Sequence, residues 1–523
     1  MARFVERFLC TMNNNSRYYR LAFFWSIFSR LLNAAFGFFS VPILLGYFGK
    51  ADYGILSIAT ACNGYMSLMD LGMNTGIVKF VSQWKAEGKY NLINRVVRTN
   101  ISFYMFVSVI NATLLLLLAF YGKSFFSIDE CQFSILRSCL IILALFSPMS
   151  WITTVFNQVL ISFGEILYTQ IVSCILVIFK LCLIIACVLQ AKLSIVGYFF
   201  ALTLLISACL IPYSWRCKQK KYIDSILPAF YWEEFRIVLN FSLALFTLSI
   251  FQVTATQLRP IILSVFSLDG ASVAADFRII EVMPQFIIML SGSFLSIFLP
   301  KATEIYSTGC VDDIRKFVNT WTLRVSIIIC FLCFPFLISP KSVLGAYVGA
   351  NYGYLSKWLA LWLAMLFVQL HSSPAYSMIM ASGKTKVLVW SSALACTISV
   401  LINILLAKKL AVGSAVIGYS IYLIIQNIFS YMYYYKKVLD LDIIQVLASF
   451  LKPVFVALLC CFVFVLIDLR VDDFSSFNVP ERARYIFVFS INSFIWMVLF
   501  SATLFVFKIV NVDDIKLIVY GKR

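Results

Sequence analysis

The sequence contains few charged residues and a single histidine, His371. Only 13% of its 523 residues are charged, and 62% are hydrophobic. A soluble domain is about 25% charged and about 45 to 50% apolar. The composition therefore excludes a chain of soluble domains. Because hydrophobic runs recur from Leu21 to Val510 without a polar domain between them, one polytopic membrane domain is predicted.

Motifs that carry enzyme chemistry are also lacking. The chain has no Gly-rich phosphate loop, no nucleotide-binding motif and no cluster of metal ligands. Cys330 and Cys333 have CxxC spacing, but a second ligand pair is missing and both lie in an apolar run, where thiols behave as small hydrophobic groups. We therefore expect no enzyme, no catalytic residue, no metal and no cofactor.

What the sequence has in abundance is apolar runs of about 20 residues, long enough to cross the hydrocarbon of a bilayer. The predicted fold is all-α, a polytopic membrane protein with about 14 transmembrane helices. These helices are expected near residues 21–45, 54–79, 99–121, 135–159, 166–190, 193–213, 237–260, 273–299, 320–340, 355–381, 386–407, 410–434, 446–468 and 485–508.

Lysine and arginine are concentrated in every second connection between the predicted helices, as in "KFVSQWKAEGKYNLINRVVR" and "WRCKQKKY". Short loops rich in these residues stay on the cytoplasmic side, so both termini are predicted to be cytoplasmic. The formal charge of +18 is then a topological signal, which also suits anionic membrane lipids. A nucleic-acid partner is not expected.

The chain repeats itself weakly at an offset of about 221 residues. Residues 79–97 align with 300–318, which places Gly88 on Gly309 and Arg95 on Lys316. Farther along, "ISFGEILY" aligns with "MASGKTKV", and Gly164 falls on Gly383. The repeated unit holds six helices, an even number, so the two copies have the same orientation in the membrane and are expected to enclose a substrate cavity at their interface.

These repeats set the predicted domains. Residues 1–220 form an N-terminal bundle of helices 1 to 6, and residues 221–440 form a C-terminal bundle of helices 7 to 12. Residues 441–523 add helices 13 and 14 and a cytoplasmic tail, without a counterpart in the repeat.

Polar stripes mark helices 1, 2, 7 and 8, two pairs that the repeat makes equivalent. A helix that lines water carries such a stripe, whereas one that faces lipid all round does not. The residues expected to line a central cavity are Arg30, Asn33, Asn63, Asp70, Gln257, Arg278, Glu281 and Gln285.

Ionisable residues within the membrane are costly and usually functional. Arg30 lies near the predicted midplane, where it either binds substrate or pairs with Asp70. Lys180 either faces the cavity or extends to the interface. His371 either takes part in a proton-coupled step or is hydrogen-bonded to the backbone.

The N-terminal region resembles the polysaccharide-repeat-unit (Wzx-type) flippases, in the superfamily that includes MATE drug exporters and the lipid II flippase. The residues that carry the resemblance are in "RLLNAAFGFFSVPILLGYFGKADYGILSIA" and "LMDLGMNTGIVKFVSQWKAEG", with later echoes in "FLPKATEIYSTG" and "MIMASGKTKV". The resemblance covers most of the first twelve helices. It implies two six-helix bundles forming a V-shaped, alternating-access transporter in the bacterial inner membrane.

The cargo that this resemblance implies is undecaprenyl-diphosphate-linked oligosaccharide for O-antigen of lipopolysaccharide, capsule or exopolysaccharide. Arg30 matches a helix-1 arginine that would meet the diphosphate, with Arg278 and Lys180 as further cationic groups. Membrane lipids, H⁺ or Na⁺ for coupling, and glycan polymerases are the implied partners. The acidic Asp276 and Glu281 beside Arg278 depart from a purely cationic cavity.

Those three charges lie in the first turns of helix 8, so they are predicted to form a gate instead of a deep anion site. The residues assigned to coupling or gating are Asp70, Asp276, Glu281 and His371, and the inner-face basic residues are Lys79, Arg95 and Lys301.

Two alternatives remain open. A MATE-like exporter of small cations would use acidic groups, and Asp70, Asp276 and Glu281 are available. A membrane-bound glycan polymerase or ligase would need catalytic groups in a large outer loop. The longest such loop, about residues 469–484, offers only the adjacent Asp472 and Asp473, which point to different sides of a regular backbone.

Overall fold

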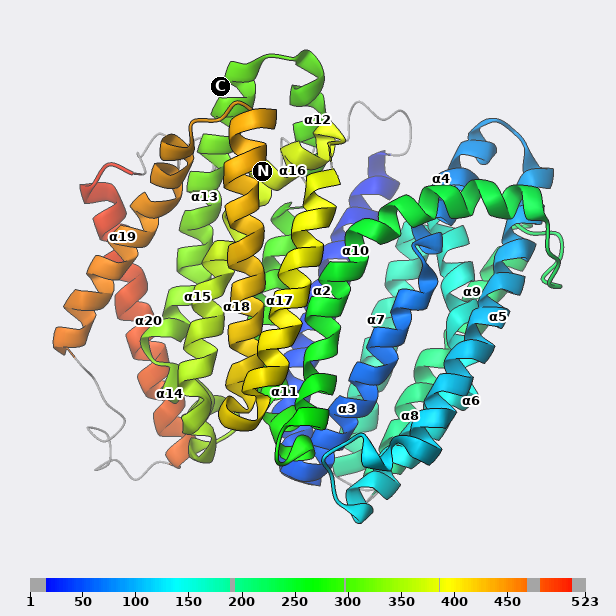
Figure 1. Cartoon of the computed structure of the whole chain (residues 1–523), viewed down its shortest axis with the longest axis horizontal. Coiled ribbons are helices and arrows are strands. Elements are labelled where there is room, and N and C mark those ends of the chain that lie inside the picture. The colour runs from blue at the N-terminus through cyan, green and yellow to red at the C-terminus, as the bar shows by residue number, and fades with distance from the viewer. Residues whose placement is uncertain (1–15, 189–192, 296–297, 385, 468–479, 510–523) are drawn as a thin grey trace. The chain divides into compact units, whose positions relative to one another are not determined.

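The computed structural model describes residues 16–188, 193–295, 298–384, 386–467 and 480–509. All regular secondary structure in these ranges is helical (Figure 1), which confirms the all-α prediction. The chain divides into two compact units. The first unit holds Arg17–Arg278 and Val400–Ala415, and the second holds Ile279–Ser399 and Val416–Arg523. The domain boundaries derived from the repeat stay a prediction.

The first unit contains the helices of the N-terminal half, α10, and the stretch Val400–Ala415, where α17 (Lys386–Leu410) ends and α18 (Val412–Phe429) begins. Its elements are α2 (Ser16–Phe48), α3 (Lys50–Met66), η1 (Ser67–Asp70), α4 (Met73–Ala86), α5 (Tyr90–Tyr121), η2 (Gly122–Ser124), α6 (Glu130–Ser162), α7 (Ile166–Ala186), α8 (Ile195–Ala208), α9 (Leu210–Gln219), α10 (Trp232–Phe266) and the start of α11 (Gly270–Leu295). Side-chain capping fixes the N-termini of two of these helices. Asp129 and Gln132 form a capping box on α6, and the Ser194 hydroxyl accepts from the Gly197 N–H at the start of α8.

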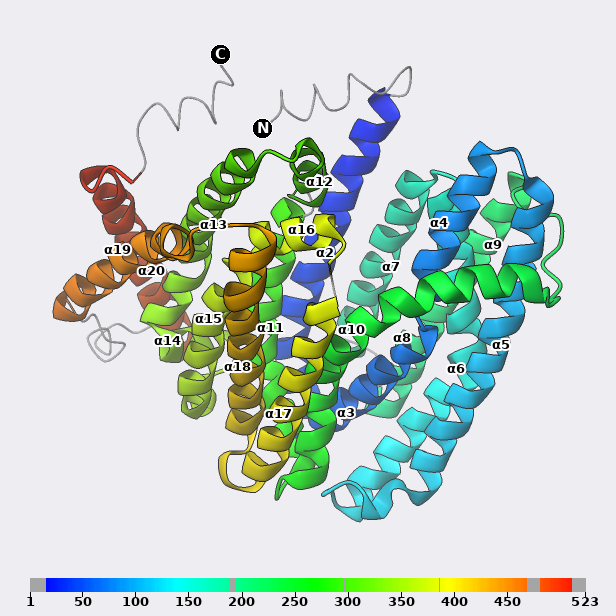
Figure 2. The same ribbon diagram turned by 45° about the horizontal axis from the view of Figure 1, so that its top comes forward.

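The second unit begins within α11. It continues through α12 (Phe298–Thr308), α13 (Val311–Ile338), α14 (Pro340–Tyr347), η4 (Ala350–Leu355), α15 (Ser356–Leu370), α16 (Ser373–Ser382), α17 (Lys386–Leu410), α18 (Val412–Phe429), the π-helical segment η5 (Ser430–Val438), α19 (Ile443–Ile467) and α20 (Glu481–Val506). α13 packs against α15, α19 and α20, and in both views α19 and α20 lie beside one another (Figure 2).

Among the described residues, 11 helices are long and apolar enough to cross a membrane. The three predicted spans absent from that set are 54–79, 237–260 and 273–299. The first of the three is interrupted, because α3 and α4 hold only 17 and 14 residues. The protein is therefore a multi-pass membrane protein. Both termini lie outside the described residues, so their cytoplasmic location stays a prediction.

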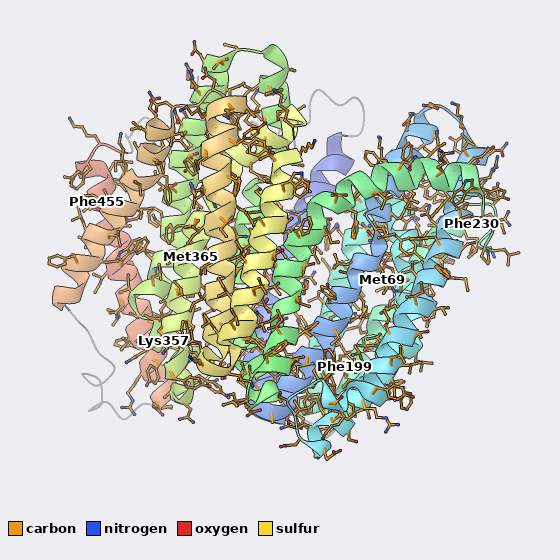
Figure 3. The ribbon with its side chains drawn as sticks, in the orientation of Figure 1. Met69, Phe199, Phe230, Lys357, Met365 and Phe455 are labelled. Atoms are coloured by element: carbon orange, nitrogen blue, oxygen red, sulfur yellow. The ribbon has the colours of Figure 1, made fainter. Side chains whose placement is uncertain are left out.

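Exposed apolar side chains cover the outward faces of the helices. Phe106 on α5 is 65% exposed and Phe455 on α19 is 61% exposed, and Figure 3 shows Phe455 pointing away from its bundle. Such surfaces are what a lipid-facing helix requires. In contrast, Cys330 and Cys333 are buried in α13, as expected of thiols that act as small apolar groups.

The second predicted helix is interrupted. α3 ends at Met66, η1 follows, and Leu71 and Gly72 both adopt left-handed backbone conformations, with φ of 50° and 74°. Gly72 also lies so close to α10 that an added Cβ would stand 2.7 Å from the Ser242 carbonyl oxygen. Glycine meets both demands because it has no Cβ. The prediction of one continuous helix over 54–79 was therefore too simple.

The internal repeat has a backbone counterpart. Gly88 and Gly309, which the sequence superposes, follow α4 and α12 with φ of 71° and 70°. Gly164 and Gly383, the second aligned pair, follow α6 and α16 with φ of 86° and 68°. Equivalent glycines therefore make equivalent left-handed turns, which supports the duplication.

One end of the first unit is held by polar contacts outside the spans. Glu165, before α7, receives hydrogen bonds of 2.9 Å from Arg216 Nη2 and from the Tyr222 hydroxyl. Burial opposes ionisation of this carboxyl, but the two donors and the arginine charge prevail and hold its pKa below the usual range. Burial and the Glu165 carboxylate raise the pKa of Tyr222 to about 12. The α6–α7 turn is thereby tied to α9 and the segment after it.

Candidate functional site

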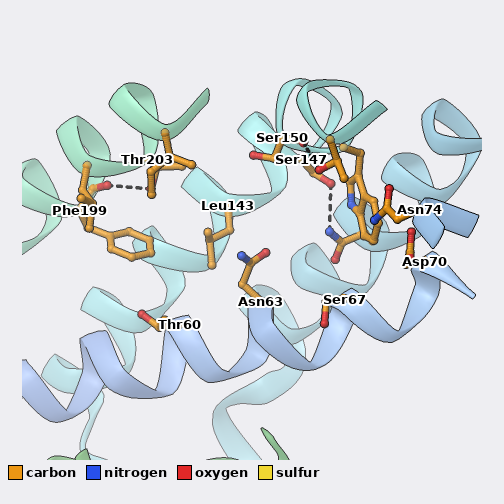
Figure 4. Close-up of a pocket in the computed structure, with 15 residues that line it drawn as sticks. Thr60, Asn63, Ser67, Asp70, Asn74, Leu143, Ser147, Ser150, Phe199 and Thr203 are labelled. Atoms are coloured by element: carbon orange, nitrogen blue, oxygen red, sulfur yellow. Dashed lines mark hydrogen bonds between the residues drawn. The ribbon is translucent and has the colours of Figure 1, made fainter. Parts of the chain in front are cut away.

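A polar pocket of about 490 Å³ lies inside the first unit, between α3, α5, α6 and α8. Its lining residues are Thr60, Asn63, Ser67, Asp70, Asn74, Asn111, Leu143, Ser147, Ser150, Trp151, Thr154, Phe199, Leu202, Thr203 and Ile206. In Figure 4, Thr60 and Asn63 point from α3 toward Leu143 and Phe199, and Asp70 and Asn74 close one end. Thr60, Asn63 and Ser67 are exposed, so the pocket is open along this helix.

The break after η1 builds one end of the pocket. Asp70, the last residue of η1, accepts a short hydrogen bond from the Tyr104 hydroxyl, and the backbone N–H groups of Gly72 and Asn74 also interact with its carboxylate. The same hydroxyl lies 3.2 Å from Asn74 Oδ1. Non-helical backbone at membrane depth is tolerated where it lines a cavity. The break in the helix at Leu71 and Gly72 therefore forms one end of the pocket.

The tyrosine also fixes an aromatic wall. Tyr104 is fully buried on α5, and its ring stacks on Trp151 of α6 at a centroid distance of 5.4 Å and an interplanar angle of 20°. Hydrogen bonding to Asp70 and stacking on the indole hold Tyr104 from both ends. Trp151 is thus positioned before any ligand arrives.

Asn111 and Ser147 form the buried part of the lining, with exposures of 2% and 3%. Asn111 Nδ2 donates to Ser147 Oγ at 3.0 Å, and Ser147 Oγ lies 3.3 Å from the Ser108 carbonyl oxygen. Asn111 Oδ1 has no hydrogen-bond partner in the described structure. Next to Ser147, Pro148 cannot donate a backbone hydrogen bond within α6.

The electrostatic character of the pocket follows from its lining. Asp70 is the one ionisable carboxyl in the set, and none of the lining residues is lysine, arginine or histidine. No group of three or more potential metal ligands was found among the described residues. The pocket can accept hydrogen bonds and present an apolar wall, and its lining has no cationic side chain with which to hold an anion.

Of the predicted site residues, Asn63 and Asp70 line this pocket and the others lie elsewhere. Arg30 is exposed on α2 and forms no ion pair within the described part of the chain. Its neighbour Asn33 donates from Nδ2 to the Ser29 carbonyl oxygen at 2.8 Å and approaches Ser173 Oγ on α7 at 3.4 Å. The alternative pair Arg30–Asp70 is not formed, because Tyr104 binds the carboxylate.

Three predicted residues lie against aromatic or glycine partners. Lys180 is half-buried, with Nζ 5.8 Å from the Phe36 ring centroid, and Lys79 Nζ lies 3.7 Å from the ring centroid of Phe241 on α10. Gln257 is exposed on α10, and its Oε1 would be 3.1 Å from a Cβ added to Gly64 of α3. The contacts with Phe36 and Phe241 account for the positions of the two lysines, so no substrate is needed to explain them.

Arg95 and Asp276 form ion pairs within the first unit. Arg95 Nε lies 2.9 Å from Glu234 Oε1, a buried carboxyl near the start of α10. Asp276 on α11 is 6% exposed, and its Oδ1 lies 2.9 Å from Lys50 Nζ at the start of α3. Asp276 is therefore bound to a lysine that the sequence did not single out.

The remaining predicted residues of α11 and the second unit are separate from the pocket lining. Arg278 and Glu281 are half-buried one turn apart on α11, and Gln285 is exposed farther along. Lys301 Nζ pairs with Glu304 Oε2 at 2.9 Å on α12.

His371 lies in the short break between α15 and α16 and is 3% exposed. Its Nδ1 lies 2.8 Å from the Phe367 carbonyl oxygen and its Nε2 lies 2.8 Å from the Tyr431 hydroxyl. The ring stacks on Phe450 at a centroid distance of 4.2 Å. Both ring nitrogens are thus occupied, and the backbone-bonded alternative for His371 fits the structure.

Sequence reasoning missed the lining contributed by α5, α6 and α8. These residues are Asn111, Ser147, Ser150, Trp151, Thr154 and Thr203. Asn111 and Thr203 are isolated polar residues in long apolar helices, whereas Ser147, Ser150, Trp151 and Thr154 have the i, i+3, i+4, i+7 spacing of one face of α6 and form a stripe that was overlooked. The available signal was the cluster "SPMSWITT" around Pro148, in which four hydroxyl side chains and a tryptophan interrupt an apolar run.

No protein-family model and no curated protein sequence matches the chain. Its fold is shared with solved membrane transporters. An inward-facing multidrug resistance MATE family transporter of the MOP superfamily aligns with a TM-score of 0.65 at 13% identity, over 77% of this chain and 93% of that one. The lipid II flippase MurJ, in an inward closed conformation, aligns with a TM-score of 0.60 at 14% identity, over 93% and 99%.

A MOP superfamily transporter from Pyrococcus furiosus, described as having a binding pocket of reverse polarity, aligns with a TM-score of 0.56 at 11% identity, over 82% and 94%. At such low identities these likenesses establish the fold. The chain has the fold of the MATE transporters and of the lipid II flippase.

Proposed function

We propose that this protein is a flippase that moves undecaprenyl-diphosphate-linked oligosaccharide across the bacterial inner membrane, for surface polysaccharide such as O-antigen, capsule or exopolysaccharide. The observation that carries the proposal is a polar pocket, rich in amide and hydroxyl groups, inside a bundle whose fold is shared with a lipid II flippase. Both termini would be cytoplasmic, as the distribution of lysine and arginine suggests.

The two structural likenesses do not separate a flippase from a drug exporter. The MATE transporter has the higher TM-score, 0.65 against 0.60, and the lipid II flippase covers more of this chain, 93% against 77%. The flippase is favoured by the sequence resemblance to Wzx-type flippases, which residues 30–59 and 68–88 carry.

The pocket chemistry suits a glycan. Sugars present many hydroxyl groups and an apolar C–H face, and the lining combines amides and hydroxyls with Trp151 and a floor of Leu143 and Phe199. The amide and hydroxyl groups of the lining therefore favour the saccharide part of a lipid-linked substrate.

Arg30 is our candidate for the diphosphate. It is exposed on a membrane-spanning helix and has no ion-pair partner in the described part of the chain. A charge in the membrane is costly unless it faces water, a partner or a substrate, and a guanidinium binds phosphate oxygens in bidentate geometry. Arg278 and Lys180 remain secondary candidates for this role.

The proposal is tested in a strain that lacks the gene. We expect Arg30→Ala to reduce surface polysaccharide at least tenfold at equal membrane levels of protein, and Arg30→Lys to retain part of it. Arg137→Ala is the matched control, because Arg137 is an exposed arginine of α6 that stacks on Phe120 at 4.7 Å. Normal polysaccharide with Arg30→Ala would rule out the diphosphate role.

A second candidate is a MATE-like exporter of small cations. Asp70 favours it, since it is the one ionisable group of the pocket lining, and the fold is shared with multidrug transporters. A drug-sensitised strain expressing the protein would then survive cationic compounds, and Asp70→Asn would abolish that survival. Two results together would favour the exporter over the flippase: survival of the drug-sensitised strain in cationic compounds, and normal surface polysaccharide in the strain that lacks the gene.

A further inference from the structure

The pocket in the first unit carries an inference that rests on the proposed function and goes beyond it. Its hydroxyl groups are largely committed as donors to backbone carbonyls. Thr60 Oγ1 bonds to the Leu56 oxygen at 2.7 Å and Ser67 Oγ to the Gly64 oxygen at 2.6 Å. On the facing helices, Thr154 bonds to Ser150 and Thr203 to Phe199, at 3.2 Å and 2.8 Å.

A hydroxyl that has donated its hydrogen keeps its oxygen lone pairs. These hydroxyl oxygens can therefore act as acceptors for a ligand. Ser147 extends the set, with its hydroxyl directed to the Ser108 carbonyl oxygen, and Asp70 can only accept when ionised. A ligand with several hydroxyl groups can donate to these oxygens and accept from the amide groups of Asn63 and Asn74.

Asn111 is a second and independent observation. It is 2% exposed, its Nδ2 is used by Ser147 Oγ, and its Oδ1 has no partner in the described structure. A buried acceptor without a partner is unfavourable by about 1–3 kcal/mol, so the site requires a donor there. Because Asn111 belongs to the pocket lining, a ligand hydroxyl can supply that donor.

Charge then narrows the class of ligand. The carboxylate of Asp70 is held by Tyr104 and by the backbone N–H groups of Gly72 and Asn74, and the pocket lining includes no cationic side chain. A carboxylate or phosphate on the ligand would bring more acceptors and a like charge. An uncharged sugar brings donors on several sides and an apolar face for Trp151. The cavity of about 490 Å³ lies within the usual range for small-ligand sites.

We propose that this pocket is a saccharide subsite, which binds an uncharged sugar residue of the transported glycan and disfavours sugars that carry a carboxylate. Asn111 and Asp70 determine its specificity, Asn111 by accepting from a sugar hydroxyl and Asp70 by repelling acidic sugars. The diphosphate end of the substrate is left to Arg30, which is not among the lining residues.

The test uses the full-length protein in lipid nanodiscs and a panel of soluble disaccharides, each neutral member paired with its uronic acid counterpart. Binding is measured by saturation-transfer difference NMR and by tryptophan fluorescence. We expect at least one neutral disaccharide to bind at millimolar concentration and its acidic counterpart to bind at least tenfold more weakly. Asn111→Leu should weaken neutral binding at least tenfold, and Asp70→Asn should narrow the difference between the pair.

Asn492→Leu is the matched control. Asn492 is 3% exposed, donates from Nδ2 to Ser339 Oγ at 3.0 Å and also has an Oδ1 without a partner, but it is not part of the pocket lining. It should leave sugar binding unchanged in the folded protein. Absence of binding by every neutral disaccharide, equal binding of the acidic counterparts, or unaltered binding with Asn111→Leu would overturn the proposal.

Transport in proteoliposomes separates this inference from the proposed function. If lipid-linked oligosaccharide is translocated but Asn111→Leu keeps full sugar affinity, the subsite is wrong and the flippase stands. If neutral sugars bind as expected but no lipid-linked oligosaccharide is moved, the flippase is wrong and the subsite stands. If the protein binds tetraphenylphosphonium but no sugar, and Asp70→Asn abolishes that binding, the pocket is a cation site and the saccharide subsite is wrong.

Discussion

Two helices of the protein are interrupted beside an ionisable side chain, and the two breaks are built differently. Between α3 and α4, Leu71 and Gly72 take left-handed conformations next to Asp70. Between α15 and α16 the backbone stays right-handed, with φ of −61° at His371 and −77° at Ser372. There the break is explained by Pro374, which cannot donate to the carbonyl one turn earlier.

The surroundings of the two groups differ as much as the backbones. Asp70 closes one end of a pocket with exposed amides and hydroxyls along its rim. His371 is sealed by Phe450 and Tyr431, and both of its ring nitrogens are bonded within the protein. An interrupted helix is thus not by itself a binding site. The break that also opens a polar cavity is the candidate for function, and the sealed one is a structural joint.

The largest expected effect on stability is at Gly72, in the left-handed break. Gly72→Val requires a β-branched residue at φ of 74° and places a Cβ 2.7 Å from the Ser242 carbonyl oxygen. We expect it to destabilise the protein by about 3 kcal/mol or more. Thermal unfolding in detergent, followed by size-exclusion chromatography, would show a lower midpoint or no monodisperse protein.

Ser372→Ala is the control at the other break. Its right-handed conformation accepts any residue, and its hydroxyl makes one long hydrogen bond of 3.4 Å to the Gln369 oxygen. The expected loss is under about 0.5 kcal/mol. Equal melting temperatures for Gly72→Val and Ser372→Ala would show that the left-handed break is not a strict requirement.

The second effect concerns His371. His371→Leu removes the bonds to Phe367 and Tyr431 and leaves the tyrosine hydroxyl buried without this partner. We expect a destabilisation of about 2–3 kcal/mol, with Tyr431→Phe costing about 1 kcal/mol because it removes one bond. Transport per folded molecule should be unchanged. A specific loss of transport in well-folded His371→Leu would give the joint a functional role.

The stripe on the second predicted helix is the part of the site that sequence could reveal. Asn63 and Asp70 were predicted to line a central cavity between the two halves; both line the pocket inside the first unit, and the central cavity stays a prediction. The break at Leu71 and Gly72 was not predicted, because the apolar pattern continues through it. The all-α fold also follows from the sequence, because apolar runs of about 20 residues predict membrane helices.

The other wall of the pocket could not be predicted. Asn111, Ser147 and Thr203 are brought together by the packing of α5, α6 and α8, which the spacing of residues along one helix does not encode. In the same way, Lys50 lies more than 200 positions from its partner Asp276. Pairings across helices depend on tertiary contacts that a single sequence leaves undetermined.

The smallest effect on stability, and the sharpest on function, is expected at Asp70. Asp70→Asn keeps the shape and an acceptor for the Tyr104 hydroxyl but removes the charge. Because hydrogen bonds to charged acceptors are worth about 1.5–3 kcal/mol and those to neutral ones about 0.5–1.5 kcal/mol, we expect a loss of about 1 kcal/mol. Melting temperature and substrate discrimination would be measured on the same preparation. A large drop in stability with unchanged discrimination would make Asp70 a cap for α4, and the two breaks would then both be structural joints.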